Sequence, residues 1–214
     1  MPVKDFSGYT FVAFMDISGF KEMMKDRNQA IKALDGLYKT GFDVLQYNDD
    51  INGFFISDSG ILFVRNIRVP MKQQLQSLLN VIENINRRLL AEDIMLTTSI
   101  SYGFFSYHKR IEVVGIEKNP IYGNAYVEAF LDNENGRPKI QPGECRILLS
   151  EELNNDIENI EKLKRERNHF YFYWMVDHER EIDNFKKEYN NAYKLKYAGM
   201  LGALKQYGLT NRST

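Results

Sequence analysis

The chain has 214 residues, of which 43% are hydrophobic and 27% are charged, a balance typical of a soluble globular protein. Lysine and arginine total 28 against 29 aspartates and glutamates, so no basic excess points to nucleic acid. This length suits one well-buried domain, and we expect a single domain over residues 1–214. A lone cysteine, Cys145, excludes an internal disulfide framework and a cysteine-only zinc site.

The sequence shows no targeting signal. Residues 1–10 lack an apolar core of signal-peptide length, and no run approaches the roughly 18 apolar residues of a membrane helix. Together with the single cysteine, this pattern predicts a cytoplasmic location.

Apolar periodicity and polar turns divide the first half of the chain into strand-like and helix-like stretches. The expected elements are a strand at 10–14, a helix from 20 to about 47 with a break near 26–28, a turn at 48–53, a hairpin at 54–64 that turns at Asp58-Ser59-Gly60, and a helix that follows Pro70 and has one apolar face as far as Leu90.

The second half continues the alternation. The expected elements are a strand at 95–105, a return strand at 108–114, a loop leading into a helix at 122–134, a loop at 133–143, a strand at 146–149, a charged amphipathic helix at 151–165, a strand at 170–176 and a helical tail at 179–207. The core, at about 10–176, has the order strand-helix-strand-strand-helix-strand, which predicts an α+β, ferredoxin-like βαββαβ fold with C-terminal strand and helix additions.

The segment FVAFMDISGF, residues 11–20, reads as a strand that stops on Asp16, a Ser-Gly turn and a helix start. A carboxylate at a strand end beside free N–H groups suits a metal ion and a phosphate chain. Asp58 is a second carboxylate at a strand break, 42 positions later, so the two could share a pair of divalent ions. Each residue taken alone has a simpler explanation, Asp58 as a hairpin-turn residue and Asp16 as an Asx turn or helix cap.

Three segments in order resemble the motifs of the class III nucleotidyl cyclase catalytic domain. Residues 14–20 match its Phe-x-Asp-Ile-x-Gly-Phe-Thr motif until Lys21 replaces the threonine. Residues 57–60 resemble its Gly-Asp motif with serine for glycine, and 122–129 resemble its Trp-Gly-x-x-Val-Asn-x-Ala helix start. The similarity covers roughly residues 11–134.

This resemblance implies a two-metal site. Asp16 and Asp58 would bridge two Mg²⁺ or Mn²⁺ ions, and the Ile17 carbonyl would complete one coordination shell. The β- and γ-phosphates would be held by the N–H groups of Ser18, Gly19 and Phe20. The family also implies a homodimer whose active sites lie at the subunit interface.

The departures from the family pattern bear on the substrate. Phe54 stands where purine cyclases have a lysine, Pro120 where they have a polar base reader, and Val127 and Leu131 where they have the transition-state Asn and Arg. Phe54 and Pro120 are therefore candidates for a changed base pocket. The charge that Leu131 cannot supply has four candidate sources, each with a solvated surface role as the alternative: Lys21, Lys109, Arg110 and Arg167.

A short stand-alone cyclase with an intact metal pair and an altered base pocket is similar to the pyrimidine cyclases of bacterial Pycsar anti-phage systems. That group implies cyclisation of UTP or CTP to a second messenger that acts on a separate effector protein. We favour UTP slightly over CTP as the substrate. The alternatives are a purine cyclase with an unusual base pocket and a catalytically inactive nucleotide-binding module. A palm-type polymerase shares the topology, but the balanced charge disfavours template binding.

Overall fold

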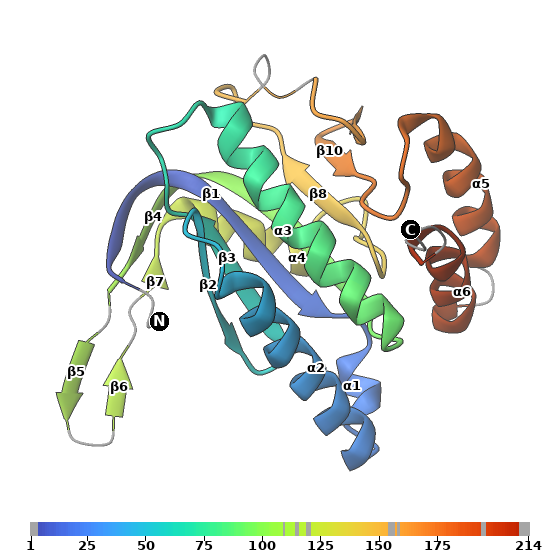
Figure 1. The fold of residues 1–214 in the computed structure, drawn as a ribbon, viewed down its shortest axis with the longest axis horizontal. Helices are drawn as coiled ribbons and strands as arrows, with labels where there is room; N and C mark the ends of the chain where they lie inside the picture. Colours follow the sequence, from blue (N-terminus) through green and yellow to red (C-terminus); the bar gives the residue numbers. More distant parts are fainter. Residues whose placement is uncertain are drawn as a thin grey trace.

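The computed structural model describes residues 4–108, 110–113, 116–118, 121–153, 157, 159–193 and 196–209. Its centre is an eight-stranded sheet with the order β2-β3-β1-β4-β8-β10-β9, in which β7 also pairs with β4. The first four strands and their helices form the expected ferredoxin-like core, because β1 lies antiparallel between β3 and β4. Figure 1 shows this arrangement.

The strands of the main sheet are β1 Phe6–Ile17, β2 Ile51–Ile56, β3 Ser59–Val64, β4 Leu96–Tyr107, β7 Ile121–Tyr122, β8 Cys145–Leu148, β9 Leu163–Glu166 and β10 His169–Phe172, and a separate hairpin is formed by β5 Arg110–Val113 and β6 Ile116–Lys118. The helices are α1 Phe20–Met23, α2 Arg27–Leu45, α3 Met71–Ala91, α4 Asn124–Asn135, α5 Ile182–Ala192 and α6 Lys196–Gly208, with a short 3-10 helix at Glu179–Glu181.

Alternation along β1 separates two hydrophobic cores. Phe11, Ala13 and Met15 point into the larger core with α2, α3 and the C-terminal helices. Val12 and Phe14 point to the opposite face, where they pack near Ala125 and Ala129 of α4 in a smaller, largely aromatic core. In Figure 1, α2 and α3 cross the near face of the sheet and α4 lies behind it.

Helix α4 is attached to β4 by polar side chains that follow the helical repeat. The four contacts, 2.7–3.0 Å long, are Thr97 to Asn133, Ser99 to Asp132, Ser101 to Glu128, and the Phe104 amide to Asn124. Gly123 starts the helix at φ 134°, and a β-carbon there would lie 2.1 Å from the Phe104 carbonyl oxygen. Only glycine permits this close approach of helix start and strand.

A buried charged cluster holds the C-terminal half of α4. The Arg146 guanidinium, 0% exposed, donates from Nε to Asp132 Oδ2 at 2.8 Å and from Nη2 to Asp132 Oδ1 at 3.0 Å. His169 Nε2 lies 3.0 Å from the same carboxylate. Burial alone would raise the pKa of Asp132, but its hydrogen bonds with His169, Arg146 and Ser99 hold the pKa below its ordinary value.

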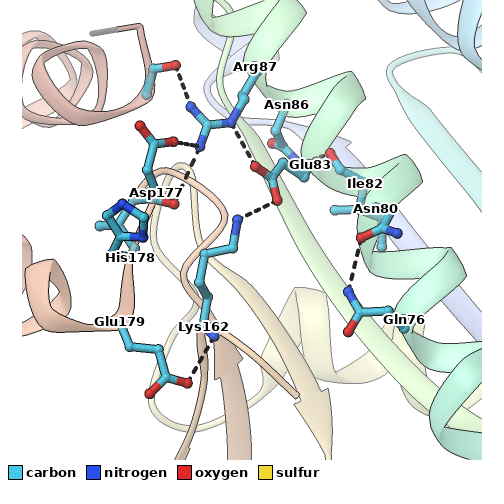
Figure 2. A network of polar contacts seen from close by, with 12 residues as sticks. Gln76, Asn80, Ile82, Glu83, Asn86, Arg87, Lys162, Asp177, His178 and Glu179 are labelled. Carbon is cyan, nitrogen blue, oxygen red and sulfur yellow. Dashed lines mark hydrogen bonds and ion pairs between the residues drawn. The ribbon is translucent and has the colours of Figure 1, made fainter. Parts of the chain in front are cut away.

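A second polar network fastens the C-terminal segments to α3 (Figure 2). Glu83 accepts hydrogen bonds from Arg87 Nε at 2.9 Å and from Lys162 Nζ at 2.7 Å. Arg87 also donates to the Asp177 carboxylate at 3.0 Å and to the Gly208 carbonyl at 2.8 Å. Because Gly208 ends α6, one arginine of α3 joins the body of the domain to its last helix.

The prediction of a charged amphipathic helix at 151–165 is wrong. In the described part of this stretch, turns link Ser150 to Leu153 and Ile157 to Ile160, and β9 then begins at Leu163. The apolar residues at helical spacing are buried as expected. Pairing of β9 with β10 uses backbone groups that a helix would need, so sheet formation overrides the local periodicity.

Smaller differences have similar causes. The hairpin starts earlier than expected, at Ile51, and turns at Ser57 and Asp58, because Ser59 is already paired with Asp16 of β1. The strand expected at 170–176 is shorter and starts one residue earlier, at His169, because its pairing with β9 ends at Phe172 opposite Leu163.

The expected single tail helix is divided into α5 and α6, which fold back on each other through Phe185 and Tyr207. The return strand expected at 108–114 appears as β5, and it pairs with β6 instead of β4. None of the helices in the described ranges combines the length and apolar character needed to cross a bilayer.

Candidate active site

Asp16 occupies the second-last position of β1, at the edge of the sheet where α1 begins. Its backbone is paired with Ser59 of β3 on one side and Thr97 of β4 on the other. The Ser59 hydroxyl donates to Asp16 Oδ1 at 3.0 Å. Since Asp16 follows Phe14 by two residues, its side chain is on the face of the sheet that α4 covers.

Asp58 is brought to the same edge by the β2–β3 hairpin. It sits in a two-residue turn after Ser57, whose φ is 55°, and its carbonyl accepts the Ile17 amide at 3.0 Å. This bond fixes the hairpin turn beside the last residues of β1. The negative charge of Asp58 acts on the Asp16 carboxyl, so the two carboxylates predicted from the sequence are neighbours, and Ile17 lies between Asp16 and the turn at residues 18–20.

The electrostatic environment of Asp16 and Asp58 favours the binding of a cation. Burial raises the pKa of Asp16 to about 6, against the Ser59 hydrogen bond, and the negative charges of Asp58 and Glu134 raise it further. No ion pair involves Asp16 among the described residues. A carboxylate that is desolvated beside other acids is stabilised when a cation binds it.

The donor set fits a hard divalent ion. The described residues contain no cluster of three or more His, Cys, Asp or Glu side chains arranged for a metal. Two carboxylates and a backbone carbonyl, those of Asp16, Asp58 and Ile17, offer only oxygen ligands, the type that Mg²⁺ and Mn²⁺ prefer. Mg²⁺ keeps several waters and shares substrate phosphates, so two protein carboxylates are sufficient.

The turn after β1 contains the three amides predicted to bind phosphate, and one of them is already engaged within the protein. The Ser18 amide donates to the Met95 carbonyl at 2.9 Å. The amides of Gly19 and Phe20 have no acceptor among the described residues, and Gly19 is exposed with φ 79°. The Ser18 hydroxyl is buried without a partner in the described structure. Of the three predicted amide donors, those of Gly19 and Phe20 therefore have no hydrogen-bond partner among the described residues.

Tyr197 of α6 lies against this turn, 178 positions further along the chain. A β-carbon on Gly19 would be 3.5 Å from the Tyr197 ring. The Tyr197 hydroxyl donates to the Asp93 carbonyl at 3.2 Å, and Lys205 of the same helix pairs with the Asp93 carboxylate. The C-terminal helix therefore supports the turn that carries Gly19.

Phe54 is half-buried on β2, on the same face of the sheet as Phe14, and belongs to the aromatic core under α4. Its ring stacks on Tyr107 of β4, with centroids 5.3 Å apart and an angle of 24° between the planes. The other predicted base-pocket residue, Pro120, lies outside the described residues.

The remaining candidates fall into different surroundings. Val127 and Leu131 are 46% and 49% exposed on the outer side of α4. Lys21 is exposed on α1, whereas Lys109 and the side chain of Arg110 lie outside the described structure. Arg167 lies in the turn between β9 and β10. Strand β9 is four strands away from β1, a distance of roughly 19 Å at the usual strand spacing, so Arg167 is far from Asp16.

Sequence reasoning missed three residues of this corner. The sequence predicts Ser59 as part of a turn and of the segment that resembles the Gly-Asp motif, yet its hydroxyl also donates to the Asp16 carboxylate. Glu134 is close enough to Asp16 to raise its pKa, and Tyr197 lies against the turn at Gly19. The position of Ser59 beside a candidate ligand was a usable signal, whereas Glu134 and Tyr197 come near only through tertiary packing.

No family model matches the sequence, and no curated protein matches it. Solved structures are similar in fold. The adenylyl cyclase CyaB from P. aeruginosa has 14% identity over 79% of this chain and 95% of that chain, with a TM-score of 0.60. The guanylate cyclase domain of RhGC from Catenaria anguillulae, solved with GTP, has 12% identity over 79% of this chain and 97% of that chain, with a TM-score of 0.60.

A third similar structure is the dimeric guanylyl cyclase domain of the RhoGC fusion protein from Blastocladiella emersonii, with 11% identity, coverage of 80% of this chain and 98% of that chain, and a TM-score of 0.61. The chain therefore has the α+β fold of class III cyclase catalytic domains, as its motifs predict. At these identities the likeness concerns the fold, and the chemistry has to be argued from the residues of the site.

Proposed function

We propose that the protein is a pyrimidine nucleotidyl cyclase that converts UTP or CTP to the 3′,5′-cyclic monophosphate and pyrophosphate. The observation that carries this proposal is the meeting of Asp16 and Asp58 at one sheet edge, beside a turn with free amides. The cyclase-like fold supports it, because the similar structures include enzymes described as adenylyl and guanylyl cyclases.

In this proposal Asp16 and Asp58 hold two divalent ions, and the Ile17 carbonyl completes one shell. The ions, when bound, would lower the pKa of the ribose 3′-hydroxyl and neutralise charge on the departing pyrophosphate. Ser59 orients the Asp16 carboxylate through its hydrogen bond. The amides of Gly19 and Phe20 take the β- and γ-phosphates, while the Ser18 amide keeps the turn fixed to the Met95 carbonyl.

The base preference rests on Phe54. Its half-buried ring, stacked on Tyr107, offers an apolar surface and no hydrogen-bonding group for a purine edge. We place UTP slightly before CTP as the substrate. The product would be a second messenger for anti-phage defence that acts on a separate effector protein.

The exposed apolar residues of α4 support a homodimer with the active sites at its interface. Val127, Phe130 and Leu131 are 46%, 37% and 49% exposed on one helix. Of the similar guanylyl cyclase domains, one is described as dimeric and another as monomeric. A partner subunit would cover this strip and bring its own groups to the substrate. Specific activity should then fall on dilution, and activity that is constant down to low nanomolar concentration would contradict a reversibly dissociating dimer.

One experiment tests the reaction. The purified protein is incubated separately with ATP, GTP, CTP and UTP in the presence of Mn²⁺, and the products are identified by mass. A cyclic pyrimidine monophosphate that disappears in Asp58→Asn is the expected result. A cyclic purine as the main product would overturn the pyrimidine assignment while keeping the cyclase.

The second candidate is a catalytically inactive module that binds nucleotide. It is favoured by Val127 and Leu131, whose apolar side chains cannot supply transition-state hydrogen bonds. Triphosphate binding without any turnover, in the dimer as well as in the monomer, would establish this alternative.

A further inference from the structure

A cavity of about 330 Å³ lies between the β10 side of the sheet and the two C-terminal helices. Residues from the start of β8, from β10, from α5 and from α6 line it, and none of them belongs to the Asp16 and Asp58 corner. Its volume is at the lower end of the range for small-molecule sites. The residues that matter for its chemistry are Glu144, Glu166, Tyr173, Phe185, Lys186 and Tyr189.

Glu144 brings an unpaired carboxylate to this cavity. It accepts the Gln141 amide at 2.7 Å and has no ion pair among the described residues. Burial raises the pKa of Glu144 to about 7, although the charge of Arg146 acts in the opposite direction. Arg146 itself is bound to Asp132, so it cannot turn to Glu144.

The second carboxylate of the cavity provides a contrast. Glu166 accepts hydrogen bonds from Lys186 Nζ and from the Tyr173 hydroxyl, each at 2.6 Å. The nearby Arg167 adds a further positive charge, so the pKa of Glu166 lies below its ordinary value despite its partial burial. In the same cavity, the charge of Glu166 is therefore balanced by Lys186, whereas the Glu144 carboxylate has no positively charged partner among the described residues.

Aromatic rings supply a further part of the wall. Phe185 stacks on Tyr189 at 5.4 Å and meets Tyr173 edge-on at 6.3 Å. The hydroxyls of Tyr173 and Tyr189 are engaged with Glu166 and the Pro142 carbonyl, so these side chains can offer the cavity only their rings. Aromatic rings beside a carboxylate attract an organic cation, through the ring faces and through direct pairing.

We propose that this cavity binds a small organic ammonium ion, whose charged end pairs with Glu144 and whose apolar body packs among Tyr173, Phe185 and Tyr189. The site is separate from the proposed cyclase centre and does not depend on its reaction. A bound ammonium would offset the cost of the unpaired carboxylate, which the fold alone leaves uncompensated.

Trp174, the single tryptophan of the chain, is a built-in reporter for the experiment. Its indole donates to the carbonyl of Gly143, a residue of the cavity wall, at 2.7 Å. The fluorescence of Trp174 is followed while the full-length protein is titrated at pH 8 with 2-phenylethylammonium, with the neutral 2-phenylethanol or with the anionic 3-phenylpropanoate. At this pH the Glu144 carboxyl is mostly ionised and an alkylammonium keeps its proton.

The ammonium should bind about tenfold more tightly than the alcohol, and the propanoate most weakly. Equal affinities of the ammonium and the alcohol, or tighter binding of the propanoate, would overturn the proposal on the wild-type protein alone.

Single-residue variants then test whether the ammonium ion binds at Glu144. Glu144→Gln keeps an acceptor for the Gln141 amide and should abolish the preference for the ammonium while leaving alcohol binding within about twofold. The matched control Glu151→Gln, at an exposed glutamate, and Asp58→Asn, at the metal corner, should both retain the preference. Loss of the preference in Asp58→Asn, or its survival in Glu144→Gln, would assign the cation to another place.

Discussion

The ring of Tyr197 lies 3.5 Å from the point that a β-carbon on Gly19 would occupy, so helix α6 packs directly on the turn proposed to hold phosphates. Gly19 has φ 79°, a conformation that its own backbone does not enforce. The surrounding contacts have to maintain it.

Replacement of Tyr197 by alanine should therefore loosen the turn. We expect the KM for the nucleoside triphosphate to rise by about three- to tenfold with a smaller change in kcat, because ground-state and transition-state binding are weakened together. Tyr197→Phe keeps the ring and loses only the bond to Asp93, so its KM should stay near the wild-type value. Steady-state kinetics with a parallel melting curve tests this. A lower melting temperature with an unchanged KM in Tyr197→Ala would contradict a role in the turn.

Metal binding should be visible without turnover. Mn²⁺ at about a hundred times its dissociation constant should stabilise the wild-type protein by about 2.7 kcal/mol, and this gain should be lost in Asp16→Asn and in Asp58→Asn. Because the pKa of Asp16 is about 6, protons compete with the ion, and the gain should shrink as the pH falls from 7 to 5.

The metal-free protein has the opposite dependence. The folded-state pKa of Asp16 is above that of the unfolded chain, so the folded state binds the extra proton and stability should rise as the pH falls from about 6 to 4. Urea unfolding with Mn²⁺ or with a chelator measures both trends. A Mn²⁺ stabilisation that persists in both variants would place the ion elsewhere.

The buried pair of Arg146 and Asp132 should be intolerant of half-removal. Arg146→Met leaves the Asp132 charge uncompensated in the core, and we expect a loss of about 3–5 kcal/mol in the free energy of unfolding. The double variant Arg146→Met with Asp132→Leu should recover most of this loss. Arg88→Met, at an exposed arginine, should change stability by less than about 0.5 kcal/mol. Chemical denaturation of the four proteins checks the prediction, and a double variant no better than the single one would contradict it.

Glu144 predicts a pH dependence of its own. Its folded pKa of about 7 exceeds the ordinary value of 4.5, so stability should fall by on the order of 2–3 kcal/mol as the pH rises through this interval, since the unfolded chain ionises first. Glu144→Gln should remove this pH-dependent contribution to stability. Relative to the wild type, the variant should therefore be more stable at pH 8 than at pH 5. The difference in unfolding free energy between variant and wild type is the quantity to measure, with Glu151→Gln as the control. A difference that does not vary with pH would contradict the prediction.

Local sequence patterns were sufficient to predict those elements whose ends are set by a few neighbouring residues. The end of β1 at Asp16 and Ile17, the helix after Pro70 and the hairpin near Asp58 follow from apolar periodicity and turn residues. The hairpin turn was displaced by one residue because Ser59 is drawn into pairing with Asp16, an interaction across 43 positions.

Predictions from local sequence patterns were wrong where the pairing of a segment with another strand overrides its apolar spacing. The apolar spacing at 151–165 predicts a helix, yet the same residues are buried in turns because β9 completes the sheet edge beside β10. The cluster of Asp132, Arg146 and His169 was also invisible in the sequence, because its members come from one helix and two strands. No local rule places a buried arginine opposite its acid.

Helix α6 carries Leu204 in the wall of the cavity and Tyr197 against the Gly19 turn, two helical turns apart on one rigid rod. An occupant of the cavity that shifts α6 would therefore change the free energy of binding at the turn proposed to hold phosphates, and by thermodynamic reciprocity a triphosphate bound there would change the occupant's affinity by the same factor. Helix α6 thus contacts both the cavity and the Gly19 turn, which share no residue, and offers a physical route for coupling between them.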